Sequence, residues 1–309
     1  MAQTCIYLQL GKEGDKFLIY IQLTKDVLMT IQELILYGIK QLPHATTPRL
    51  DVEMLLVHIL HCSQAILRSH PEREIPNSIF VEFKNLLIRR STGEPVAYIV
   101  GEKHFWNFSV EVSKHVLVPR PDTEVLVEQA LAKIKQNNNS EIQILDLGTG
   151  SGIVAIALAL EIPNACIHAV DCSLVALNVA KVNATKNSVS NIFFYHGNWF
   201  DPLTQKQKQF HLIVSNPPYI AKDDPYLLGN ELGFEPEEAL VSGPLGLDAL
   251  TTIVSHGYSF LMHGGWLLVE HGYNQVTQVT ELFRNYNYSS ISSHKDLQGH
   301  FRVTCGCKL

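Results

Sequence analysis

The sequence has few charged residues, few cysteines and no repeated or low-complexity tract. Only 17% of its 309 residues are charged, whereas 46% are hydrophobic, and disordered chains have the opposite balance. The apolar patch Phe17–Ile21 is too short to cross a membrane, and it follows charged residues rather than preceding a cleavage site. We therefore expect a soluble globular protein, with no membrane partner, made of one large domain and a smaller companion.

Cysteine is scarce and irregularly spaced. The six cysteines do not form the dense pattern of a disulfide-stabilised secreted domain. Cys305 and Cys307 flank one glycine, but no second Cys or His pair lies at zinc-like spacing. The sequence therefore predicts reduced thiols, a cytoplasmic location, no bound metal and an alternating strand near the C-terminus.

Positive charge is also scarce in the C-terminal two thirds. The net charge is −6, and residues 101–309 carry fourteen basic and twenty acidic side chains. Proteins that bind nucleic acid normally present a basic face to the phosphates. We therefore expect no direct nucleic-acid partner.

Residues 29–94 have the apolar spacing of helices. Thr47 and Pro48 are typical of a helix N-cap followed by proline at the first helical position, with Asp51 near the positive end of the helix dipole. These features predict a small helical domain. Residues 1–28 lie outside this pattern, and we hypothesise that the working protein begins at Met29.

After residue 94 the chain contains short strand-like runs and, further on, amphipathic helical stretches between them. Residues 95–120 contain short alternating runs that predict a β-hairpin linker, and residues 121–309 predict a larger α/β domain. In that domain, apolar runs typical of buried strands are Ile142–Leu147, Cys166–Asp171, Asn191–Tyr195, Phe210–Ser215 and Trp266–Glu270. Amphipathic stretches between them cover 151–161, 173–186, 246–263 and 273–285. This alternation predicts a doubly wound sheet, closed by an antiparallel pair at 288–294 and 300–308.

A glycine-rich turn follows the first of these strands. Gly148, Gly150 and Gly152 have the spacing G-x-G-x-G, which lacks the third glycine of the dinucleotide fingerprint G-x-G-x-x-G. Asp146 precedes them, and a carboxylate there disfavours phosphate and favours a cationic ligand such as the methionine part of S-adenosylmethionine. An ordinary strand-to-helix turn is the alternative.

Two further positions follow neighbouring strands. Asp171 ends the second strand, where a carboxylate can accept hydrogen bonds from both hydroxyls of a ribose; it could also cap the following helix. Trp199 follows the third strand, either beside an adenine or in the core.

Asn216-Pro217-Pro218-Tyr219 after the fourth strand is the strongest motif. The prolines hold an extended backbone and donate no N–H, so the Asn216 side-chain oxygen and the Pro217 carbonyl can accept both hydrogens of a planar –NH2 group while Tyr219 stacks on it. A plain loop is the alternative. Fixing the amide favours the charge that develops on nitrogen during methylation. No His or Glu adjoins the motif, so no side-chain base is expected.

Together these segments resemble the release factor glutamine methyltransferases of the PrmC/HemK family, over residues 29–309. The resemblance also rests on four further segments, which are Thr47–Asp51, Gly93–Tyr98, Val118–Glu124 and Glu235–Leu240. Near the C-terminus the match is looser, since Phe301 stands where an acidic residue is usual.

The resemblance implies a class I S-adenosylmethionine-dependent methyltransferase with a seven-stranded Rossmann-like sheet, a β-hairpin linker and an N-terminal helical domain that binds the substrate protein. The substrate implied is the glutamine of the Gly-Gly-Gln motif in class I peptide chain release factors, methylated at N5, by an enzyme expected to be monomeric. Carried over by position, the cofactor-binding residues are Asp146, Leu147, Gly148, Thr149, Gly150, Asp171, Trp199 and Asn216, and the catalytic and substrate-binding residues are Asn216, Pro217, Pro218 and Tyr219.

Three other functions remain open at this point. A sister enzyme methylates a glutamine of a large-subunit ribosomal protein. Adenine-N6 DNA methyltransferases share the Asn-Pro-Pro-Tyr motif, but they need a basic surface to hold and flip a base. A non-catalytic protein that only binds S-adenosylmethionine would not need residues 216–219.

Overall fold

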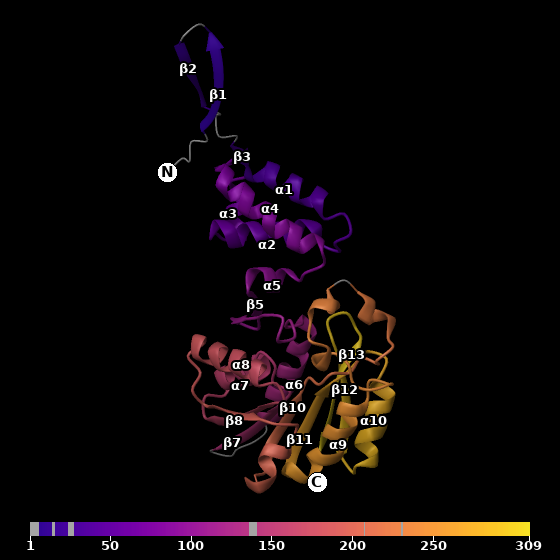
Figure 1. The fold of residues 1–309 in the computed structure, drawn as a ribbon. Helices are drawn as coiled ribbons and strands as arrows, with labels where there is room; N and C mark the ends of the chain where they lie inside the picture. The colour runs from indigo at the N-terminus through magenta and orange to yellow at the C-terminus, as the bar shows by residue number, and fades with distance from the viewer. Residues whose placement is uncertain (1–5, 14–15, 24–27, 136–140, 207, 230) are drawn as a thin grey trace. The chain divides into compact units, whose positions relative to one another are not determined.

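The computed structural model describes residues 6–13, 16–23, 28–135, 141–206, 208–229 and 231–309 (Figure 1). The chain divides into two compact units, residues 1–99 and residues 100–309. No helix in the described ranges is both long enough and apolar enough to cross a membrane.

The smaller unit is mainly helical. Its elements are β1 (Ile6–Glu13), β2 (Lys16–Leu23), β3 (Met29–Thr30), α1 (Ile31–Gln41), α2 (Pro48–Leu60), α3 (Gln64–Ser69), β4 (Glu74–Ile75), α4 (Asn77–Ser91) and the start of α5 (Val96–Val100). Strands β1 and β2 form an antiparallel hairpin. The helices predicted over residues 29–94 are confirmed, and they bury Leu34, Leu55 and Phe83 completely.

The predicted start of α2 is confirmed, with Pro48 at the beginning of the helix and Asp51 in its first turn. Thr47 occupies the N-cap position, but its hydroxyl makes no capping bond to the helix backbone and instead donates to Asp51 Oδ1 at 2.9 Å. Asp51 in turn forms a buried ion pair with Arg90 Nε at 2.7 Å. The carboxylate therefore joins α2 to α4, because a buried charge without a partner is strongly destabilising.

The larger unit is built on one seven-stranded sheet of order β12-β13-β11-β10-β7-β8-β9 (Figure 1). Its strands are β7 (Ile142–Leu147), β8 (Ala165–Asp171), β9 (Ile192–His196), β10 (Phe210–Ser215), β11 (Leu261–Glu270), β12 (Ser289–Lys295) and β13 (Phe301–Cys307). Only β13 runs antiparallel to its neighbours β11 and β12. The predicted doubly wound sheet and its closing antiparallel pair are confirmed.

Helices join the strands and cover the sheet. They are α6 (Glu124–Ile134), α7 (Ile153–Glu161), α8 (Leu174–Lys186), α9 (Asp248–Phe260) and α10 (Val276–Asn285), with short 3-10 turns in the loops. Leu147 and Ile213 belong to a buried cluster that includes Ile253 of α9 and Phe283 of α10. Because successive strand residues point to opposite faces, Asp146 faces away from this cluster.

The hairpin of β5 (Glu102–Phe105) and β6 (Phe108–Glu111) belongs to the larger unit. The backbone N–H of Glu111 donates to Asn183 Oδ1 of α8 at 2.7 Å, and Asn187 Nδ2 donates to the Ser109 carbonyl at 3.0 Å. This anchoring fixes the start of the segment that leads to α6.

Candidate active site

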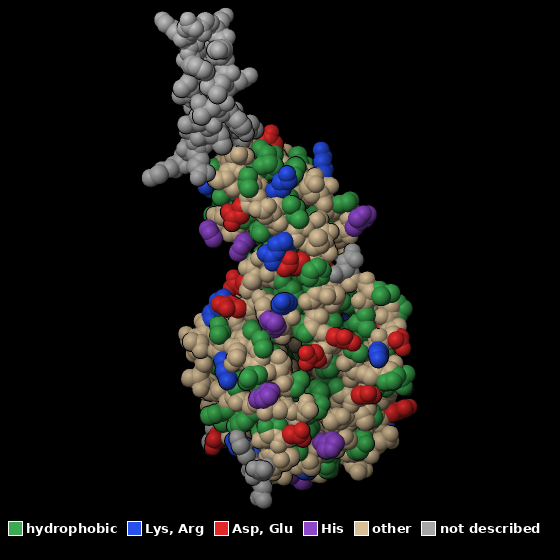
Figure 2. Space-filling model, in the orientation of Figure 1, with side chains coloured by type: hydrophobic (Ala, Val, Ile, Leu, Met, Phe, Trp, Pro, Cys, Tyr) green, Lys and Arg blue, Asp and Glu red, His purple; other side chains and the backbone are tan. Residues whose placement is uncertain are grey.

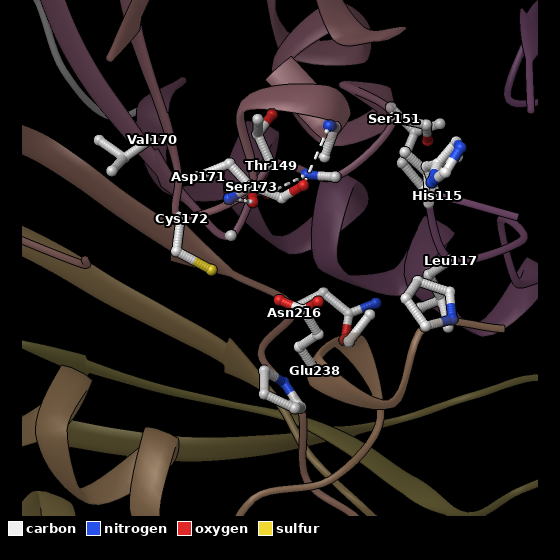
Figure 3. A pocket seen from close by; sticks show the side chains of 18 of the residues that line it. His115, Leu117, Thr149, Ser151, Val170, Asp171, Cys172, Ser173, Asn216 and Glu238 are labelled. Carbon is white, nitrogen blue, oxygen red and sulfur yellow. Dashed lines mark hydrogen bonds between the residues drawn. The ribbon is translucent and has the colours of Figure 1, made fainter. Parts of the chain in front are cut away.

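A cavity of about 300 Å³ lies at the carboxyl ends of β7, β8 and β10. Its walls are the glycine-rich turn after β7, the end of β8, the turn after β9, the motif after β10, and parts of segments 114–123 and 236–239. Thr149, Asp171 and Ser173 lie on one side of it, with Asn216 and Glu238 on the other (Figure 3). The strand order reverses between β7 and β10, and open α/β sheets bind ligands at such a point.

The glycine-rich turn has a backbone that requires glycine. Gly148, Gly150 and Gly152 have φ angles of +71°, +57° and +88°, in the region that L-residues with a Cβ rarely adopt. A Cβ on Gly152 would also lie 3.1 Å from the Cβ of Ala180, so this glycine lets α7 approach α8. The turn brings backbone groups of residues 148–151 to the cavity.

Asp146 lies at the cavity with its carboxylate almost fully buried. Thr149 Oγ1 donates to its Oδ2 at 2.7 Å. Burial, with a smaller contribution from the charge of Asp171, raises the pKa of Asp146 to about 7. No basic side chain in the described ranges pairs with it, so a cationic ligand would find an uncompensated carboxylate here.

Asp171 holds the backbone around the cavity. Its Oδ2 accepts the N–H of Gly150 at 2.8 Å and its Oδ1 accepts the N–H of Ser173 at 2.8 Å. The cap of α8 is Ser173, whose hydroxyl accepts the N–H of Ala176. Burial, followed by the nearby charge of Glu238, raises the pKa of Asp171 above its ordinary value. Asp171 is therefore not the cap of α8, and it lines the cavity.

Of the predicted cofactor-binding residues Trp199 and Leu147, Trp199 lines the cavity and Leu147 does not. Trp199 lines the cavity and also packs against the core cluster, and its ring comes within 3.5 Å of the place where a Cβ on Gly148 would lie. Trp199 therefore contacts both the core and the cavity, and its place beside an adenine stays a prediction. Leu147 is fully buried in the core cluster and its side chain does not line the cavity, because it lies on the sheet face opposite to Asp146.

In the Asn-Pro-Pro-Tyr motif, Asn216 and Pro218 line the cavity. Asn216 Nδ2 donates to Thr123 Oγ1 at 3.1 Å, which leaves its side-chain oxygen available to a ligand. Pro217 is buried, and no donor in the described ranges binds its carbonyl oxygen. The two acceptors that the sequence predicted for an –NH2 group are thus both unused.

Tyr219 does not line the cavity. Its hydroxyl donates to Glu270 Oε1 at 3.3 Å, and burial raises its pKa above the ordinary value. Gln275 Nε2 donates to the Tyr219 carbonyl at 2.9 Å, and a Cβ on Gly246 would lie 2.2 Å from that carbonyl oxygen. Tyr219 anchors the motif here, and its stacking on a substrate amide stays a prediction.

The cavity also contains side chains that the sequence did not identify. His115, Thr123, Cys172 and Glu238 line it, so titratable groups do reach the site although none adjoins Asn216 in sequence. Thr123 and Glu238 fall within segments that carry the family resemblance, which is the one signal that could have found them. No group of three or more potential metal ligands occurs in the described ranges.

Comparisons with known proteins identify both parts of the chain. Residues 33–101 match the PrmC N-terminal domain family and residues 122–243 match the methyltransferase small domain family. The release factor glutamine methyltransferase of Buchnera aphidicola subsp. Schizaphis graminum is 41% identical over 275 residues, which cover 88% of this chain and 96% of that protein.

The enzyme of the same name from Coxiella burnetii is 42% identical, covering 83% of this chain and 91% of that protein. A methyltransferase structure from Pyrococcus furiosus, at 16% identity, has a TM-score of 0.48 and covers 67% of this chain and 91% of that chain. With the sheet order described above, the family matches identify a class I methyltransferase that uses S-adenosylmethionine. The chain belongs to the family of release factor glutamine methyltransferases.

Proposed function

We propose that the protein transfers the methyl group of S-adenosylmethionine to the side-chain N5 nitrogen of the glutamine in the Gly-Gly-Gln motif of class I peptide chain release factors. The observation that carries this proposal is the free side-chain oxygen of Asn216 at the cavity that also contains Asp146 and Asp171. The carbonyl oxygen of the next residue, Pro217, accepts no hydrogen bond within the described ranges. We place this reaction in the cytoplasm, where release factors act, and expect a monomeric enzyme.

The residues of the cavity fit S-adenosylmethionine. When bound, it supplies an electrophilic methyl group on a positively charged sulfur. Asp146 is a buried carboxylate without a basic partner in the described ranges, which suits the positively charged methionine part. Asp171 would accept the ribose hydroxyls and Trp199 would flank the adenine. Gly148 and Gly150 let the ligand approach the backbone, and Thr149 fixes Asp146.

At the other end, Asn216 and Pro217 would hold the glutamine amide. Each oxygen accepts one N–H, which orients the nitrogen and stabilises the positive charge that develops on it. The amide nitrogen would bond to the methyl group as the S–CH3 bond breaks, with the electron pair left on sulfur. The methylated nitrogen would then be acidic and would release its proton to water or to a backbone oxygen.

The experiment that tests the function offers several substrates in parallel. Purified release factor, large-subunit ribosomal proteins and duplex DNA would each be incubated with the enzyme and S-adenosylmethionine, and mass spectrometry would locate any added methyl group. We expect modification of the Gly-Gly-Gln glutamine alone. Methylation of ribosomal protein or DNA, with release factor unmodified, would overturn the proposal.

We also assign a role in substrate binding to the helical unit. Its interior is built separately from that of the larger unit, so a chain that begins at residue 100 should retain S-adenosylmethionine binding. That chain should lose methylation of intact release factor while still modifying a free Gly-Gly-Gln peptide at high concentration. Full activity on intact release factor would exclude this role.

A further inference from the structure

A chain of four side chains links the cavity to the carboxyl end of β11. Asn216 Nδ2 donates to Thr123 Oγ1 at 3.1 Å. The Thr123 hydroxyl is bonded to the carboxylate of Glu270 at the end of β11, and the Tyr219 hydroxyl lies 3.3 Å from Glu270 Oε1. Thr123 is completely buried and Glu270 nearly so, so water does not compete for the bond between these two side chains.

Thr123 ends the 3-10 turn Pro121–Thr123, which leads directly into α6, and its own backbone is helical. Its side chain makes no capping bond to the helix backbone. Here the hydroxyl is used between Glu270 and Asn216 instead.

The chemistry of the groups sets the direction of this chain. An ionised carboxylate only accepts hydrogen bonds, so Thr123 must give its single hydroxyl hydrogen to Glu270. The Thr123 oxygen is then left as an acceptor, and only the nitrogen of the Asn216 amide can satisfy it. The amide oxygen of Asn216 consequently faces the cavity.

We propose that Thr123 and Glu270 are positioning residues that lock the Asn216 amide with its oxygen toward the substrate. The inference rests on the proposed function. A reversed amide would present –NH2 to the –NH2 of a glutamine and favour a carboxylate in its place. The hydrogen bonds that run from Glu270 through Thr123 to Asn216 form a relay. This relay would select glutamine over glutamate, since a site built for one hydrogen-bond pattern rejects the other.

The ionisation of Glu270 provides a second way to test the relay. Burial raises the pKa of Glu270 to about 7, against the opposing effects of the Thr123 hydroxyl, Arg302 and the Tyr219 hydroxyl, while Asp122 adds to the rise. Its Oε2 has no hydrogen-bond partner in the described ranges. Protonated Glu270 could donate to Thr123 and release the constraint, so kcat should fall as the pH drops below about 7.

The test compares single and double variants on release factor. Thr123→Val removes the hydroxyl at nearly constant volume and should lower kcat about tenfold, the scale of one hydrogen bond. Thr123→Ser restores a hydroxyl and should recover most of kcat. Thr304→Val removes an equally buried hydroxyl, bonded to His271, and should leave kcat within about twofold. The Kd for S-adenosylmethionine should be unchanged in all three.

A double-mutant cycle separates positioning from folding. If Thr123 acts through Asn216, Thr123→Val should have almost no effect on kcat in an Asn216→Ala background. The relay would be overturned if Thr123→Val had its full effect in that background, or if Thr123→Val had normal kcat while the wild-type enzyme was active. Either result would leave the proposed function unchanged. A wild-type enzyme that does not methylate release factor would instead refute the proposed function.

Discussion

Arg120 forms an ion pair with Glu235, which lies 115 residues further along the chain. The same carboxylate accepts the backbone N–H of Val118 at 3.1 Å through its other oxygen. One buried side chain thereby ties the segment before α6 to the loop that carries Glu238. Both segments line the cavity, so Glu235 holds two of its walls together.

Glu235→Ala should loosen these walls. Arg120 and the Val118 N–H would both lose their partner, and we expect the free energy of unfolding to fall by about 2 kcal/mol together with weaker S-adenosylmethionine binding. Denaturant unfolding and calorimetric titration would measure the two effects. Glu237→Ala, an exposed neighbour on the same loop, is the matched control. Equal stability and equal S-adenosylmethionine binding in the two variants would show that Glu235 does not hold the two segments together.

Asn216→Ala should reduce kcat by roughly 10²-fold, because it removes an acceptor that acts in the transition state. The Kd for S-adenosylmethionine should change little, since the amide binds the substrate side. Single-turnover methylation of release factor and cofactor titration would separate the two quantities. Unchanged turnover would remove Asn216 from the mechanism.

The binding of S-adenosylmethionine should depend on pH near neutrality. The pKa of Asp146 is raised to about 7 by burial, and a cationic ligand favours the ionised carboxylate. Below pH 7 binding must release a proton, so the Kd should fall as the pH rises from 6 to 8 and then level off. Titrations in buffers with different ionisation enthalpies would count the proton. A flat profile in the wild type, matching that of Asp146→Asn, would exclude this linkage.

Gly38 in the middle of α1 should tolerate no side chain. A Cβ there would lie 2.7 Å from Val52 Cγ2 and 3.0 Å from the Phe83 ring, so Gly38→Ala should destabilise the helical unit by about 1–3 kcal/mol. Gly233→Ala, where a Cβ would meet nothing within 4 Å, should be neutral. Thermal unfolding followed by circular dichroism would compare them, and equal stability would show that α1 and α2 can move apart.

Removal of residues 1–28 should leave the enzyme folded and active. Met29 and Thr30 pair with Ile75 and Glu74, and Thr30 and Glu33 form a capping box at the start of α1. These interactions survive the cut, which removes the β1–β2 hairpin. Melting temperature and release factor methylation would test it. A loss of solubility or fold would show that residues 1–28 are part of the working protein.

The central strands of the larger unit could be predicted closely because they are short runs of residues buried on both faces, as in Phe210–Ser215. The glycine turn and the Asn-Pro-Pro-Tyr motif were also recognisable, since their chemistry is local in sequence. Leu147 was assigned to the cofactor by position along the motif alone, and the alternation of strand faces puts its side chain in the core.

What the sequence could not reveal depends on distant partners. Thr123 lies 93 residues from Asn216, and nothing near Glu270 in the chain indicates that it faces Tyr219. Asp51 illustrates the same limit in the helical unit, where its partner Arg90 is 39 residues away. Such pairings become visible only once the fold brings the elements together.

The anchoring of the β5–β6 hairpin has a practical consequence for any attempt to shorten the chain. Asn183 uses its amide oxygen for the Glu111 N–H and its amide nitrogen for the carbonyls of Glu111 and Ser151. A chain that started at residue 121 would leave this fully buried amide half unpaired beside the glycine-rich turn, and it would lack the wall formed by residues 114–120. A cut placed just before the hairpin would keep both, so the smallest piece able to bind its methyl donor should begin near residue 100.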